Sequence, residues 1–94
     1  MQKPTIHLNG TSGETLTEGY LDAMDAISNA MRKLGAIAPH ARDYYVQGDD
    51  AFHKVWTENA ARVTMLQHVR TEIGELLAHV QEQLAEREAI RRGR

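Results

Sequence analysis

The stretch from His40 to Gln47 holds the densest group of side chains that could bind a ligand. The candidate residues in it are His40, Arg42, Tyr44, Tyr45 and Gln47. A tyrosine offers a flat face for stacking, and the fork of an arginine matches phosphate oxygens. These groups suit a nucleotide that is held by base stacking and by charge. A structural alternative stays open, in which one tyrosine caps the core and Arg42 pairs with Asp43 or with an acidic residue of the preceding helix.

A second group of candidate ligand residues lies near the N-terminus, just before a predicted helix. Its members are His7, Asn9, Gly10, Thr11 and Ser12. Free backbone N–H groups at a helix start bind phosphate, so we predict that the segment Gly10–Gly13 donates N–H groups to an anion. The alternative is a helix cap without a ligand. Thr11 and Glu14 have the spacing of a capping box, although Ser12 could cap instead.

Three further candidates lie within the predicted helices. Tyr20 is a third stacking candidate, and Arg62 and Arg70 could meet phosphate. No acidic residue lies between Asn59 and Thr71, so Arg62, His68 and Arg70 form a local basic belt. Arg70 interrupts an apolar stripe, and a buried guanidinium requires an anionic partner. We leave open whether that partner is the ligand or a carboxylate.

Several kinds of chemistry are excluded or disfavoured. The chain has no cysteine, which excludes disulfides, thiolate metal sites and a cysteine nucleophile. No two of its five histidines are three or four residues apart, so no helical metal pair exists and no metal is expected. No Ser–His–acid arrangement can be argued, and we expect a protein that is not an enzyme and has no cofactor. The net charge of −2 argues against nucleic acid as a partner, and the tail Arg87, Arg91, Arg92 and Arg94 suits a helix C-terminus.

The elements that carry these residues are predicted to be helical. The 94 residues are enough for one domain, and 5% aromatic residues favour an all-α protein. After a lead at 1–12, a first helix is expected over 13–34, with Gly35 as its left-handed end. Its apolar positions follow steps of three and four: Leu16, Tyr20, Ala23, Met24, Ile27, Ala30, Met31 and Leu34.

A long second helix is expected over 49–90, after a connection at 35–48 and before a basic tail at 91–94. Asp49 or Asp50 can cap it. Its stripe has heptad spacing and runs through Phe52, Trp56, Asn59, Val63, Leu66, Arg70, Ile73, Leu77, Val80 and Leu84. The predicted fold is therefore a hairpin of one short and one long helix.

The unequal helix lengths predict self-association. Helices of 22 and 42 residues are about 33 and 63 Å long, so the first covers half of the second. We expect the stripe from about Ile73 to Leu84 to need another partner, which gives a dimer or higher oligomer through the long helix. The alternative is that the long helix breaks near Gly74 and folds back as a third helix.

The location expected from the sequence is the cytoplasm. No run of 18 apolar residues is present, so no membrane span is expected. Residues 1–10 lack the apolar stretch of a signal peptide.

Two segments, His7–Ser12 and Pro39–Gly48, resemble those of small uncharacterised phage and prophage proteins, with a similarity over about residues 5–80. The resemblance implies a phage origin and no particular chemistry. In size, helix order and an oligomeric long helix with Tyr and Arg, the chain more loosely resembles phage anti-defence sponges. Those short helical oligomers sequester the cyclic nucleotides of host immune systems such as CBASS and Thoeris. This likeness transfers no site residue.

Together these observations predict a non-enzymatic phage anti-defence protein that binds a small phosphorylated or cyclic nucleotide signal in the host cytoplasm. The alternative is a helical protein–protein interaction module, either an inhibitor of a host defence enzyme or a small virion or assembly component. In that case the loop tyrosines and Arg42 would be interface anchors, because Tyr and Arg dominate binding hot spots.

Overall fold

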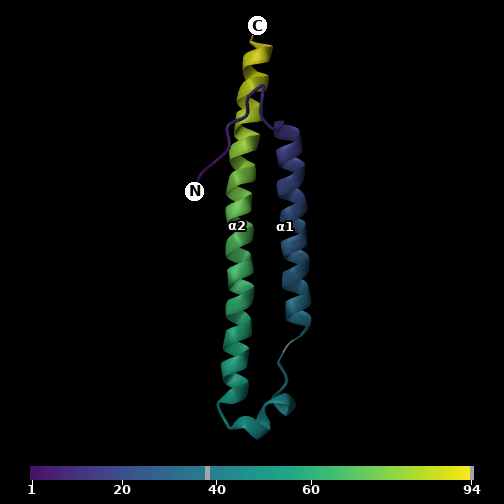
Figure 1. Cartoon of the computed structure of the whole chain (residues 1–94), viewed down its shortest axis with the longest axis vertical. Helices are drawn as coiled ribbons and strands as arrows, with labels where there is room; N and C mark the ends of the chain where they lie inside the picture. Colours follow the sequence, from purple (N-terminus) through teal and green to yellow (C-terminus); the bar gives the residue numbers. More distant parts are fainter. Residues whose placement is uncertain (38, 94) are drawn as a thin grey trace.

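Two antiparallel helices of unequal length lie side by side in the computed structural model, which describes residues 1–37 and 39–93 (Figure 1). Helix α1 spans Gly13–Ala36 and helix α2 spans Ala51–Arg92. Two short 3-10 turns, η1 at Ala41–Asp43 and η2 at Tyr45–Gln47, lie in the connection. Every regular element in the described residues is helical, which confirms the predicted all-α class with one short and one long helix. Ala38 of the predicted connection and Arg94 of the predicted basic tail lie outside the described residues.

The start of α1 is fixed by a serine cap. Ser12 has extended backbone angles, and its Oγ accepts a hydrogen bond from the backbone N–H of Thr15 at 3.1 Å. The predicted capping box of Thr11 and Glu14 is therefore wrong, and the alternative cap at Ser12 is confirmed. Ser12 satisfies one of the four free N–H groups that every helix start exposes.

The end of α1 does not use Gly35. The helix continues through Gly35 to Ala36, and the N–H of Ile37 donates to the carbonyl of Leu34 at 3.1 Å. This tightened last turn closes the helix without a left-handed residue, so the predicted role of Gly35 is wrong. Among the described residues, positive φ occurs at Gly48 instead, where 118° lets the chain turn into α2.

Helix α2 is continuous over 42 residues. It begins after Asp50, as predicted, although the Asp50 side chain makes no capping hydrogen bond. Gly74 does not break it, so the alternative of a third helix is wrong. A Cβ at Gly74 would lie 3.5 Å from Cε of Met24, which shows that α1 packs closely at this point.

The core lies where the first turns of α1 meet the second half of α2. Val80 is fully buried and Leu77 is 8% exposed, while the other large apolar side chains on the facing sides are half-buried. Gly13 packs against Leu84, and Met24 lies beside Gly74, so α1 runs along α2 from about residue 84 towards its start.

This register overturns the expectation that Ile73 to Leu84 lacks a partner. The stripe in that stretch contains the most buried side chains of the chain. The connection between the helices is long. The last residues of α1 therefore meet α2 beyond the first turns of α2. Helix α1 leaves uncovered the first turns of α2, where η2 packs, and the last turns, which project beyond Gly13 (Figure 1).

The Gly13–Leu84 contact gives a direct test of this register. A Cβ built on Gly13 would lie 2.5 Å from Cδ2 and 2.9 Å from Cγ of Leu84. We expect Gly13→Ala to lower the free energy of unfolding by about 1–3 kcal/mol through overpacking. Gly19→Ala is the matched control, because nothing lies within 4 Å of its Cβ position, and it should raise stability by about 1 kcal/mol. Urea denaturation of both variants checks this, and stabilisation by both would contradict the register.

Candidate functional site

The predicted site residues fall into three groups at different levels of the hairpin. His7, Asn9, Gly10, Thr11 and Ser12 lie where the N-terminal segment enters α1. The connection residues His40 to Gln47 lie at the other end of α1, and Figure 1 shows the two regions at opposite ends of the hairpin. A 24-residue helix separates them by about 36 Å. One small ligand therefore cannot touch both groups within one chain.

The N-terminal segment is held against α2 by a glutamine clamp. The Nε2 of Gln83 donates to the carbonyl of Pro4 at 3.0 Å, and its Oε1 accepts from the N–H of Ile6 at 2.8 Å. The Nε2 of His79 lies 3.0 Å from the same Pro4 carbonyl. One side-chain amide thus satisfies two backbone groups of the N-terminal segment, and residues 4–6 lie against the part of α2 that contains His79 and Gln83. We call residues 1–6 the strap.

Beyond the strap, the chain turns back around an open hollow of about 780 Å³. The N–H of Gly10 donates to the carbonyl of His7 at 3.2 Å and closes this turn. The hollow is bounded by the turn, by the start of α1 and by the end of α2. Its lining includes Leu8, Ser12, Gly13, Arg87, Ile90 and Arg91. The first residues of α1 therefore line a space that two arginines also line.

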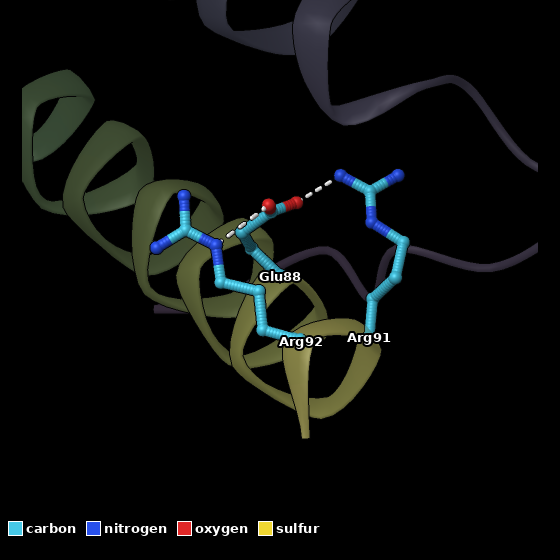
Figure 2. Close-up of polar contacts among 3 residues, drawn as sticks. All are labelled: Glu88, Arg91 and Arg92. Carbon is cyan, nitrogen blue, oxygen red and sulfur yellow. Dashed lines mark hydrogen bonds and ion pairs between the residues drawn. The ribbon is translucent and has the colours of Figure 1, made fainter. Parts of the chain in front are cut away.

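The arginines of the hollow were not chosen from the sequence, where they were interpreted as cations that suit a helix end. Glu88 pairs with Arg91 through Oε2 and with Arg92 through Oε1, the latter at 3.2 Å from Nε. Figure 2 shows the two arginines reaching this carboxylate from opposite sides. Arg87 has none of the ion pairs found among the described residues. The four-residue spacing of Arg87 and Arg91 indicates that both arginines lie on one side of a helix. The sequence does not indicate that the N-terminal segment lies opposite them, because the fold sets that contact.

The connection forms a polar and aromatic tip. The Nδ1 of His40 accepts a hydrogen bond from the N–H of Arg42 at 3.1 Å and so caps η1. Tyr44 is half-buried, which fits the alternative of a tyrosine that caps the core, whereas Tyr45 is 74% exposed. Arg42 and Gln47 are exposed. The tip offers surface side chains, and the hollow at the other end of α1 offers a concave site.

The remaining candidates lie along the helices. Tyr20 is half-buried on α1. Arg62 lies 3.7 Å from Glu58 on the exposed surface of α2. The Nε of Arg70 donates to Oγ of Ser28 at 2.7 Å, and the arginine is half-buried rather than fully enclosed. A carboxylate partner for Arg70, predicted as one of two cases, is absent from the described ion pairs.

Two kinds of feature are absent from the described residues. No group of three or more His, Asp or Glu side chains there could hold a metal ion. No helix in the described part of the chain is long and apolar enough to cross a bilayer.

The fold and the hollow define this chain as a two-helix hairpin with an N-terminal strap. In the comparisons with known proteins, no family model, no curated protein and no solved structure matches the chain.

The Arg70–Ser28 hydrogen bond predicts a small effect of truncation. Arg70→Ala removes one charge-assisted bond at a half-exposed position, so we expect a loss of about 1–2 kcal/mol in the free energy of unfolding. A buried ion pair would give a loss of about 3–5 kcal/mol. Ser28→Ala should give a similar small loss, and the double variant should lose less than the two single losses combined. A loss near 4 kcal/mol for Arg70→Ala alone would point to a carboxylate from another chain.

The clamp predicts selective release of the strap. Gln83→Ala removes both hydrogen bonds to the backbone of residues 4–6, so the Ile6 amide should lose its protection from hydrogen exchange. Stability should fall by about 1–2 kcal/mol. Gln81→Ala is the control, because Gln81 is exposed on the same helix. Unchanged protection of Ile6 in Gln83→Ala would contradict the clamp.

Proposed function

We propose that this chain is a non-enzymatic binding protein that sequesters a small phosphorylated ligand in the hollow at the start of α1. The observation that carries this proposal is the convergence of a helix N-terminus with Arg87 and Arg91 around an open space of about 780 Å³. That volume lies in the range of small-molecule sites. A helix start favours a phosphate through its free N–H groups and its dipole, and arginine adds charge-assisted hydrogen bonds.

Apolar side chains supply the rest of the site. Leu8 is 93% exposed and Ile90 62% exposed, and both line the hollow together with the half-buried Ile6. These groups offer contact area to a base or ribose, and His7 adds a polar ring. The acidic residues Glu14 and Glu88 also line the space. Glu88 is engaged by Arg91 and Arg92, so a phosphate would compete with this carboxylate for Arg91.

The looser likeness to nucleotide sponges suggests the kind of ligand. In this proposal it is a cyclic or otherwise phosphorylated nucleotide used as an immune signal, bound in the host cytoplasm during phage infection. Sequestration needs affinity without turnover, so the ligand should be recovered unmodified from denatured protein.

A second candidate function is that of a protein–protein interaction module, and it is favoured by the tip. Four large apolar side chains near the connection are exposed by more than half: Ile37, Tyr45, Val46 and Trp56. Exposed aromatic side chains beside Arg42 are typical of interface anchors. In this case the partner would be a host defence enzyme or a component of the virion.

A thermal-shift screen tests the ligand proposal. Cyclic di- and trinucleotides and cyclic ADP-ribose isomers should include one that raises the melting temperature in a concentration-dependent manner. Arg87→Glu should abolish that rise, because it places a carboxylate in the hollow. Lys33→Glu is the matched charge reversal near the other end of α1, and it should keep the rise.

Native mass spectrometry of protein from cells with active immune signalling should show the same ligand retained. No rise with any nucleotide, together with co-purification of one host protein, would replace this proposal with the interaction module.

A further inference from the structure

The hairpin exposes more surface than a compact monomer of its mass. Its accessible surface is 7293 Å², and its extents are 72 × 22 × 20 Å. A folded monomer of 10.6 kDa exposes about 5,500 Å², so the excess is about 1,800 Å². A stable interface removes about 600–1,000 Å² from each partner. The excess is therefore large enough for a full interface with a second copy.

Helix α2 has a second seam in addition to the side that packs on α1. Besides the stripe that faces α1, α2 carries the apolar residues Met65, Val69 and Leu76 on a neighbouring side. The second seam runs in steps of three and four through Arg62, Met65, Val69, Glu72, Leu76, His79 and Gln83. An apolar stripe on a helix normally packs against a partner.

The strap covers only one part of this second seam. His79 and Gln83 contact the backbone of Pro4 and Ile6, as described above. Towards the start of α2 the seam is open, and there Met65 is 61% exposed and Val69 45% exposed. The side chains of Arg62 and Glu72, which flank this pair, are each 52% exposed. We call residues 62, 65, 69 and 72 the open seam.

The open seam is complementary to itself in the antiparallel sense. If two copies of α2 cross between residues 65 and 69, Met65 of one copy lies opposite Val69 of the other. The same register sets Arg62 opposite Glu72 on both sides of the apolar centre. A parallel arrangement would instead set each residue against its own copy, with arginine against arginine and glutamate against glutamate, which is repulsive.

We propose that a second copy of this chain docks antiparallel on the open seam, with Met65 and Val69 at the centre of the interface. The two straps then lie at either end of the contact and limit its length. The register also sets Ala51 of one copy at the level of Gln83 of the other, so the connection of each chain lies towards the end of its partner that carries the strap and the hollow. The tip of each chain thereby approaches the hollow of its partner, and the two groups of ligand candidates that lie apart in one chain come to the same end of the dimer. That last consequence for the ligand rests on the proposed function, whereas the dimer does not.

The first test measures, without any ligand, the mass of the protein in solution and the relative orientation of the two copies. Light scattering at micromolar concentration should give twice the chain mass. The chain has no cysteine, so a spin label can be placed at an exposed position by Lys54→Cys. In the proposed register residue 54 lies opposite residue 80, which separates the two labels by about 40 Å along the helices. A monomer mass, or labels within about 20 Å as a parallel pair requires, would overturn the proposal.

The second test reverses the charges of the open seam. Arg62→Glu and Glu72→Arg should each weaken dimerisation at least about tenfold, because each places like charges opposite one another. The double variant Arg62→Glu/Glu72→Arg should restore it. Gln67→Glu is the control on an exposed position outside the seam and should leave the dimer intact. Helix content by circular dichroism separates dissociation from unfolding, and a double variant as weak as the single ones would overturn the register.

The two tests separate this inference from the function proposed above. A dimer that shows no thermal shift with any nucleotide would support docking at the open seam and contradict the proposed ligand. A monomer that still binds a nucleotide would support the hollow as a ligand site and contradict docking at the open seam.

Discussion

A helix can cover only as many residues of an antiparallel neighbour as it has itself, because both rise by the same 1.5 Å per residue. Helix α1 has 24 residues and α2 has 42, so α1 leaves a large part of α2 without helical cover. The rest of the structure follows from this mismatch. The connection packs on the first turns of α2, the strap covers one side of its second half, and the last turns project beyond the pair. The hollow exists because the chain must cross from the strap to α1 around that projecting end.

The strap shows how a short extended segment can stabilise a helix surface without forming a sheet. A segment outside regular structure exposes N–H and C=O groups that need partners, and the middle of an α-helix has no free backbone groups to offer. The side-chain amide of Gln83 meets this need, since it provides one donor and one acceptor. Val80, three residues before Gln83 on the same helix, is fully buried. Polar pairing and apolar burial thus reinforce one another at the end of the hairpin where the hollow lies.

The two ends of the hairpin expose different kinds of surface. At one end, the start of α1, two arginines and exposed leucine and isoleucine side chains surround a concave space. At the other, aromatic and aliphatic side chains project from a short irregular connection. Concave mixed surfaces suit small ligands, and convex aromatic surfaces suit macromolecular partners. An antiparallel dimer would set the concave surface of one copy near the convex surface of the other. The geometry of the dimer therefore bears on both the ligand-binding and the protein-binding candidate functions.

The sequence by itself determined the helical class, the two elements, their unequal lengths and the residues of the facing stripe, because three-to-four spacing of apolar residues encodes a helix face locally. Local chemistry also allowed Ser12 as the cap and placed the start of α2 after Asp50. The tertiary structure decided the register of the helices, which depends on the path of the connection and on the fit of Gly13 against Leu84. It also decided that Gln83 binds the N-terminal segment and that Arg87 joins the start of α1. These contacts join residues more than 70 positions apart, and no local spacing rule specifies which distant groups meet.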